Sequence, residues 1–191
     1  MGLIRNLLAL VGLIVVSALV YLIVLAQGVP SFDSKAGSTY WEMAKTLAQT
    51  GNGAEATVVK IPVTEGLSTD EVEEVMRFVA NEHNIKNVGE LPLSKEVSLQ
   101  TGEPTRFLKI YMFCNPLTAA LMVDYSEAFS AYLPCRISLV EDKAGKLWLY
   151  TLNMDLMIHG GAELPDDLKK EALEVQKVIM DIMQRAAEGD F

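Results

Sequence analysis

The strongest strand signals in this chain of 191 residues are RFLKIYMFCNP, residues 106–116, and LPCRISLVEDKAGKLWLYTL, residues 133–152. The apolar run of the first segment covers both faces, which is typical of a central strand. Asn115 suits a helix N-cap and Pro116 the first helical position, so a helix is predicted over 115–128. The second segment predicts two strands, 135–141 and 146–152, joined by a hairpin loop.

The segments on either side complete an α+β pattern. Apolar periodicity and a β-branched run predict the remaining elements: helices over 38–49, from Ser68 and from Pro165, and a strand over 56–63. Ser68 and Glu71 have the spacing of a capping box. We predict no helix or strand in the polar stretch 81–103. We therefore expect one α+β domain over 54–191, with a mixed sheet and helices packed mainly on one face.

The N-terminal segment is strongly apolar. Residues 7–26, LLALVGLIVVSALVYLIVLA, carry no charge and no proline. As a helix they span about 30 Å, the thickness of the hydrocarbon core of a bilayer. A cleaved signal peptide is the alternative, but its apolar region usually runs only about 7–15 residues. We therefore expect a retained transmembrane anchor over 1–26, followed by a linker and short helix over 27–53.

The charges that flank the apolar stretch predict its orientation. Arg5 precedes it, and the first cation after it is Lys35. The positive-inside bias places the N-terminus in the cytoplasm. We expect a single pass through the cell inner membrane, with the C-terminal domain on the periplasmic or extracytoplasmic side.

Composition excludes several classes of function. A formal net charge of -9 leaves no basic surplus for a general nucleic-acid binder. Two cysteines supply neither a disulfide-rich scaffold nor a four-thiolate zinc site. Phosphate-loop, dinucleotide-binding, metalloprotease and nucleophile-elbow motifs are absent from the sequence. Acid pairs such as Glu73-Glu74 are expected on the solvated surface.

Two short motifs carry a family resemblance. Cys114-Asn115-Pro116 ends a strand and opens a helix, and Leu133-Pro134-Cys135 starts a strand that leads into a hairpin, a methionine-containing turn and a long last helix. This arrangement resembles the domain of unknown function 302 family over roughly residues 54–187, although Arg136 stands where that family often has Asn. The resemblance implies a small α+β domain and homodimerisation, and it implies no catalytic residue.

The two cysteines are the first candidates for chemistry. Leu108, Ile110, Met112 and Cys114 alternate onto one strand face, and Cys135 starts a second strand with a similar alternation. We expect both thiols on the core face and close together. Cys114 precedes a helix N-terminus, which lowers the pKa of a thiol. The pair is a disulfide, a redox couple or a ligand pair in one interpretation, and two inert core thiols in the other.

A second candidate follows the last predicted strand. Met154, Met157 and His159 are soft or borderline metal ligands, and together with cysteine they favour copper. In the alternative interpretation the two methionines fill the core. His159 precedes Gly160-Gly161 and is expected to be exposed. The sequence does not identify a cofactor.

We therefore expect a membrane-anchored, exported accessory or assembly subunit without catalysis of its own. It would bind a partner protein or membrane complex, form a homo-oligomer, or offer its acidic surface to a basic soluble electron carrier. The alternative is a thiol-redox or metal-handling protein, related to copper or haem, that uses Cys114 and Cys135. A third, weaker interpretation is an enzyme with its pocket between the halves of a dimer.

Overall fold

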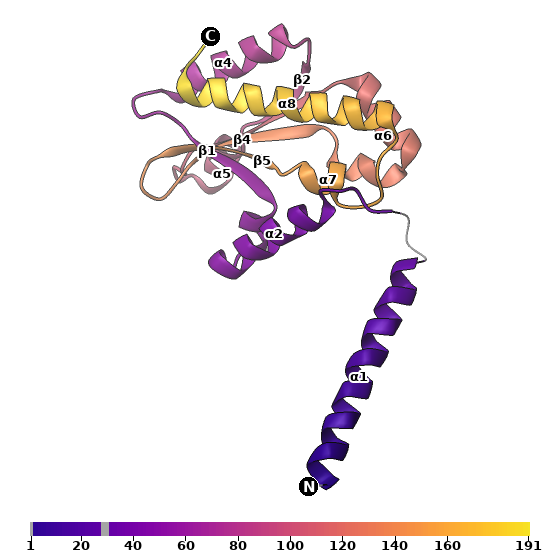
Figure 1. Ribbon diagram of the computed structural model, residues 1–191. Coiled ribbons are helices and arrows are strands. Elements are labelled where there is room, and N and C mark those ends of the chain that lie inside the picture. Colours follow the sequence, from indigo (N-terminus) through magenta and orange to yellow (C-terminus); the bar gives the residue numbers. More distant parts are fainter. Residues whose placement is uncertain (1, 28–30) are drawn as a thin grey trace.

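The computed structural model describes residues 2–27 and 31–191, so residues 28–30 of the predicted linker lie outside the described part. The fold is α+β, as the sequence predicts (Figure 1). Its helices are α1 Gly2–Gln27, α2 Ala36–Thr50, α3 Gly53–Ala56, α4 Thr69–Glu82, α5 Leu93–Thr101, α6 Pro116–Tyr125, the 3-10 helix η1 Glu127–Tyr132, α7 Asp155–His159 and α8 Asp166–Glu188. Its strands are β1 Val58–Pro62, β2 Lys86–Leu91, β3 Leu108–Cys114, β4 Cys135–Glu141 and β5 Leu147–Leu152.

The five strands form one sheet in the order β1-β5-β4-β3-β2, and each neighbouring pair is antiparallel. The expectation of a mixed sheet is therefore wrong. Helix α4 connects β1 to β2, and these two strands do run in the same direction. They lie at opposite edges, however, because β3, β4 and β5 fill the space between them. No parallel pair therefore forms among the described strands.

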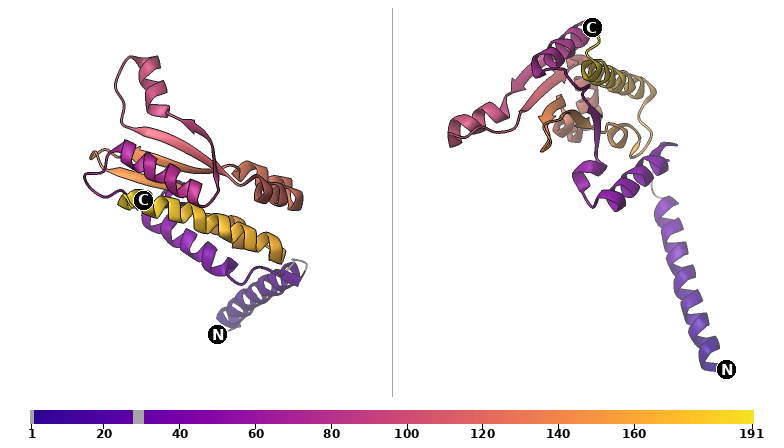
Figure 2. Two further views of the ribbon diagram at one scale, coloured as in Figure 1. Left: turned by 90° about the horizontal axis from the view of Figure 1, so that it is seen from above. Right: turned by 90° about the vertical axis from the view of Figure 1, so that its left-hand side faces the viewer.

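Helices α4 and α8 lie side by side on one face of this sheet, which confirms helices packed mainly on one face (Figure 2). The core between the layers comes from alternate strand residues and from the apolar stripes of the two helices. Its largest fully buried side chains include Tyr111, Phe113, Ile137, Leu139, Leu149, Met76, Ile179, Ile182 and Met183.

The face of β3 that enters this core differs from the expected one. Tyr111 and Phe113 are buried, whereas Ile110 and Met112 on the alternate face are only half-buried. Because both faces of this strand are apolar, alternation in the sequence does not distinguish them. The deciding neighbours are Ile137 and Leu139 of β4 and the helices above them.

Local signals fixed the helix ends well. Ser68 and Glu71 form the predicted capping box at the start of α4. The Asn115 side chain accepts hydrogen bonds from the backbone N–H groups of Leu117 and Thr118, and Pro116 opens α6. Gly51 ends α2 in the left-handed conformation, with φ of 65°, which a residue with a side chain adopts at an energetic cost.

The polar stretch 81–103 contains two elements that the sequence did not predict, β2 and α5. Strand β2 is an edge strand whose residues are largely exposed, so it lacks an apolar alternation. Gly89 lies under Met112, and a Cβ atom there would come within 2.6 Å of the Met112 Cε. Helix α5 has nine residues and none of them is buried, so it too lacks an apolar stripe.

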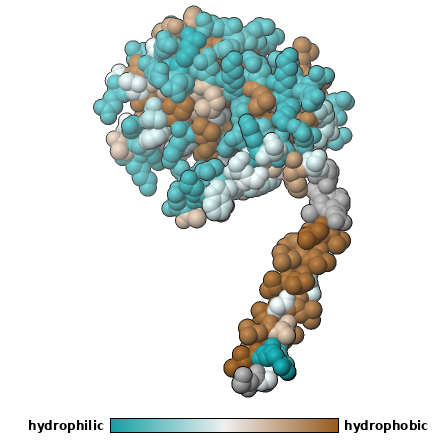
Figure 3. Space-filling view, viewed as in Figure 1, coloured by the Kyte–Doolittle hydropathy of each residue, from teal (hydrophilic) through white to brown (hydrophobic). Residues whose placement is uncertain are grey.

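Among the described residues, helix α1 is long and apolar enough to cross a membrane. Residues Ile4–Leu25 have a mean hydropathy of 3.0, and none of this stretch is buried against the rest of the chain. In the space-filling view it is a nearly continuous apolar rod beside a largely hydrophilic body (Figure 3). Its length and composition fit a bilayer span.

Candidate functional site

The two cysteines and three methionines line one small cavity, which we call the sulfur cavity. Its volume is about 10 Å³. The sulfur-bearing residues around it are Cys114, Met122, Cys135, Met154 and Met157, and the rest of the lining includes Phe113, Asn115, Thr118 and Val175. This cavity lies at the edge of the main core, because Cys135 packs against both hydrophobic clusters of the domain.

The strand register explains how the cysteines meet. Cys135 is directly opposite Phe113 in the β3–β4 ladder, so it lies on the core face. Cys114 is one residue further on and belongs to the alternate face. The expected reason, a shared face, is therefore wrong. The two residues line the same cavity because β3 ends at Cys114 and α6 begins immediately after it. Both are free thiols.

Burial disfavours the thiolate form of both cysteines. Burial raises the pKa of Cys135 to about 11, and the neighbouring Cys114 adds to this effect. Burial also raises the pKa of Cys114. The expectation that the α6 N-terminus lowers this pKa is wrong. Its first free N–H groups, those of Leu117 and Thr118, are already paired with the Asn115 side chain.

The predicted trio of Met154, Met157 and His159 is divided between two places. Met154 and Met157 line the sulfur cavity, whereas His159 is not part of its lining. His159 is also buried, with 3% of its surface exposed, so the expectation of an exposed histidine is wrong. Helix α7 has only two residues after Met157, and its last residue, His159, faces Asp33 of the N-terminal segment instead.

His159 belongs to a buried contact that we call the tether latch, formed by Asp33, His159 and Lys169. Asp33 is 3% exposed. Its Oδ2 lies 2.6 Å from the Lys169 Nζ, and its Oδ1 lies 3.1 Å from the His159 Nδ1 without a directed hydrogen bond. The hydrogen bond from Lys169 is the main reason why the pKa of Asp33 falls well below its usual range.

Backbone pairing extends the latch. Phe32 forms an isolated antiparallel bridge with Ala162, and the Asp33 N–H donates to the Gly161 carbonyl at 2.9 Å. The Tyr40 hydroxyl donates to the Gly160 carbonyl at 2.6 Å. The end of the linker is therefore docked onto the loop between α7 and α8. Gly160 is required by α7 itself, because a Cβ there would clash with the Leu156 carbonyl oxygen, whereas a Cβ at Gly161 would meet nothing within 4 Å.

A larger groove adjoins both features, and we call it the aromatic groove. It has a volume of about 320 Å³ and lies between η1 and the loop after α7. Its lining includes Tyr125, Phe129, Tyr132, Met157, Gly161 and Ala162. Met157 is thus shared with the sulfur cavity, and Ala162 with the docked linker. Figure 1 shows α6 and α7 at the same end of the domain.

Sequence reasoning missed a buried ion network on the helix-covered face of β3. Glu73, expected on the solvated surface, is 8% exposed. Its carboxylate lies 2.7 Å from both the Arg77 Nη2 and the Lys109 Nζ. Arg77 and Lys109 also contact Glu90, at 3.0 and 2.8 Å. Lys109, a lysine inside the apolar run of β3, is the sequence signal that indicates this network, because a buried lysine needs an acidic partner.

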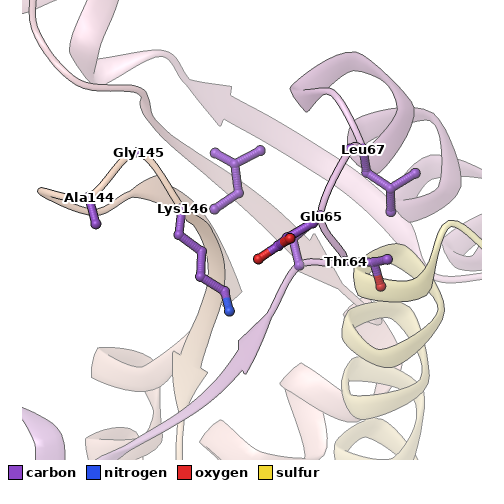
Figure 4. A pocket seen from close by; sticks show the side chains of 9 residues that line it. Thr64, Glu65, Leu67, Ala144, Gly145 and Lys146 are labelled. Carbon is purple, nitrogen blue, oxygen red and sulfur yellow. The ribbon is translucent and has the colours of Figure 1, made fainter.

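A separate pocket of about 300 Å³ lies between the loop after β1 and the β4–β5 hairpin (Figure 4). Glu65 and Lys146 are the charged residues of its lining, and their side chains point toward one another across it. It contains none of the predicted site residues. Throughout 2–27 and 31–191, no three His, Cys, Asp or Glu side chains are grouped so that they could hold a metal ion.

Comparison with known proteins agrees with this architecture. The family model described as "Domain of unknown function DUF302" matches residues 59–186. A crystal structure of an uncharacterised conserved DUF302 protein from Bacillus stearothermophilus has a similar fold, with a TM-score of 0.56 and 14% sequence identity, over 68% of this chain and 98% of that chain. No curated protein matches the chain. Over residues 59–186, about two thirds of its length, this chain therefore belongs to the DUF302 family.

Proposed function

We propose that this protein is a membrane-anchored accessory subunit whose domain binds a membrane-bound partner protein through helix α6 and the aromatic groove. The observation that carries the proposal is the outer face of α6. Leu117, Leu121 and Tyr125 follow one another at helical spacing and are 79%, 50% and 46% exposed. Exposed apolar stripes of this kind mark interaction surfaces.

The inner face of α6 already packs against the rest of the domain. Met122 is buried in the second hydrophobic cluster, and the Thr118 hydroxyl donates to Glu171 of α8 at 3.2 Å. The outer stripe therefore cannot turn inward without breaking these contacts. Asp124 is the single charged residue of the helix. An amphipathic surface helix that faces water carries polar residues on its outer face. The apolar outer face of α6 therefore fits contact with a partner better than contact with water.

The tether latch supports a partner at the membrane. Phe32 pairs with Ala162, which lines the aromatic groove. The chain from Gln27, the last residue of α1, to Phe32 spans at most about 18 Å. The groove therefore stays close to the bilayer surface when α1 is inserted. A partner that is itself embedded in that membrane can reach it, and a freely diffusing carrier is less well placed.

Arg5 before the apolar stretch favours a cytoplasmic N-terminus, so we place the domain on the extracytoplasmic side of the inner membrane. The family resemblance adds homodimerisation to the proposal. Light scattering at micromolar concentration is expected to give the mass of a dimer. Protease treatment of intact spheroplasts is expected to digest the domain.

The test compares two leucine variants in gently solubilised membranes. The Leu117→Ser, Leu121→Ser variant removes the apolar stripe, and Leu99→Ser changes a leucine that is 72% exposed on α5. A photo-crosslinker at Ala128, which lines the aromatic groove and is unchanged in every variant, is expected to capture one membrane protein in the wild type and in Leu99→Ser, and to lose it in the double variant. Equal capture by all three chains, or none by the wild type, would overturn the proposal. Capture of a second copy alone would reduce it to self-association.

A further inference from the structure

We infer that the sulfur cavity binds a single soft metal ion of the Cu(I) class. This inference is independent of the partner proposed above. It begins from where the sulfur atoms of the chain are placed. The sequence has two cysteines and nine methionines, and both cysteines and three of the methionines line this one cavity. They come from four separate elements: the end of β3, α6, the start of β4, and α7 with its N-cap residue Met154.

The chemistry of the lining selects a class of metal. Thiolates and thioethers are soft ligands that favour Cu(I), whereas carboxylates and water suit Mg²⁺ and Ca²⁺. No carboxylate and no imidazole lines the cavity, and its polar members are Asn115 and Thr118. Within the described ranges no cluster of three His, Cys, Asp or Glu is available either. Any metal held here would depend on sulfur.

The size of the cavity sets the number of ions. A volume of about 10 Å³ corresponds to about one water-sized sphere. That is room for one ion and far too little for a haem, so the haem-related alternative has no support at this place. The cavity is also accessible. Cys114 is half-buried, and Met157 lines both the cavity and the aromatic groove.

A second small cavity extends this route. It measures about 20 Å³ and shares Cys135, Met154 and Met157 with the sulfur cavity. A metal ion delivered to the groove would therefore pass from Met157 to the thiols. Sulfur ligands on an access route allow transfer in steps, with no need for a fully hydrated ion to enter the core.

Binding must release protons, because thiols coordinate as thiolates. With both cysteines as ligands, one Cu(I) ion replaces two thiol protons, and the site changes from neutral to a single negative charge. No electron is transferred in this step. Burial raises the pKa of Cys135, and the nearby positive charge of Arg136 offsets this only in small part, so the metal ion has to displace the thiol protons. Affinity for Cu(I) is therefore expected to rise with pH.

The experiment uses the full chain in detergent micelles under anaerobic conditions. Cu(I) is supplied as its acetonitrile complex and competed with bathocuproine disulfonate. We expect one Cu(I) per chain, affinity lower by at least 100-fold in Cys114→Ser and in Cys135→Ser, and lower by about tenfold in Met157→Leu. Met112→Leu, a methionine of β3 outside the cavity, is the matched control and should bind as the wild type does. X-ray absorption should show sulfur ligands only.

A second measurement avoids the variants, in case a serine in the core prevents folding. In the wild type, alkylation of Cys114 and Cys135 by a maleimide is followed by mass spectrometry with and without one equivalent of Cu(I). Slower alkylation of both cysteines supports the inference. Unchanged alkylation, a spectrum with nitrogen or oxygen ligands, or competition no better than that of the Cys114→Ser, Cys135→Ser chain would overturn it and leave two inert core thiols.

Discussion

Replacing Lys109 by methionine is expected to destabilise the domain several times more than the same change at Lys60. The two lysines are closely matched. Each lies on a strand with its Nζ 2.7 Å from a carboxylate, Glu73 for Lys109 and Glu55 for Lys60. Each also lies over an aromatic ring, at 5.0 and 5.8 Å from the centroid. They differ in burial, because the Lys109 side chain is 16% exposed and the Lys60 side chain 45%.

The magnitude follows from what each substitution leaves behind. Removing one partner of a buried ion pair costs about 3–5 kcal/mol, because the other charge stays buried and unpaired. Here Arg77 still contacts both carboxylates, and its own side chain is 46% exposed. We therefore expect a loss of about 2–3 kcal/mol for Lys109→Met. An exposed ion pair contributes about 0–1 kcal/mol to stability, so Lys60→Met should lower the free energy of unfolding by less than about 1 kcal/mol.

Urea unfolding of a chain beginning at Ser31, which keeps the tether latch, measures both values. With a slope of about 2 kcal/mol per molar urea, Lys109→Met lowers the midpoint by about 1–1.5 M, and Lys60→Met by less than 0.5 M. Adding Glu73→Gln to Lys109→Met should recover part of the loss, since it removes the stranded charge. Equal midpoint shifts for the two lysines, or no recovery in the double variant, would refute the reasoning from burial.

Three further predictions concern the latch, the thiols and the anchor. Lys169 holds the pKa of Asp33 below its usual value of about 4. The latch should therefore be intact above pH 4 and weaken as the pH falls below 4. Hydrogen exchange of residues 31–36 should become faster at these low pH values, and in Asp33→Asn it should be faster already at pH 7. Cys114→Ala and Cys135→Ala should each cost about 1–2 kcal/mol in urea unfolding, more for the deeper Cys135; no loss at either position would contradict their role in packing. The intact mass of the mature protein should include residues 7–26, and an N-terminus near Gln27 would show a signal peptide instead.

Elements of the fold were predictable from the sequence where a local pattern is compatible with one structure only. The capping box at Ser68, the N-cap at Asn115 and the hairpin between β4 and β5 depend on neighbours in the sequence, and each formed as expected. The antiparallel order and edge strand β2 depend on which strands occupy the centre of the sheet. That is decided by packing among distant segments, and no single segment carries it.

The candidate site shows the same division. The cysteines and methionines were identifiable by residue type, but their shared cavity depends on β3 ending where α6 begins and on α7 returning beside it. The prediction of an exposed His159 was wrong for a similar reason. A histidine before two glycines is expected to be exposed, and it is buried because Asp33, 126 positions earlier, docks against it. Glu73 likewise is buried because it pairs with Lys109 of β3, 36 positions later, and with Arg77 of its own helix.

Met157 connects the two proposals physically. It lines the aromatic groove, where a partner would bind, and the sulfur cavity, where Cu(I) would bind. If a metal ion draws its side chain toward Cys135, the floor of the groove changes shape. Linkage then requires that the partner alter Cu(I) affinity by the same factor by which Cu(I) alters partner affinity. The latch holds the loop after α7 on the other side of the groove, through Phe32 and Asp33. A change in the shape of the groove would therefore come from Met157 and from the aromatic residues of α6 and η1.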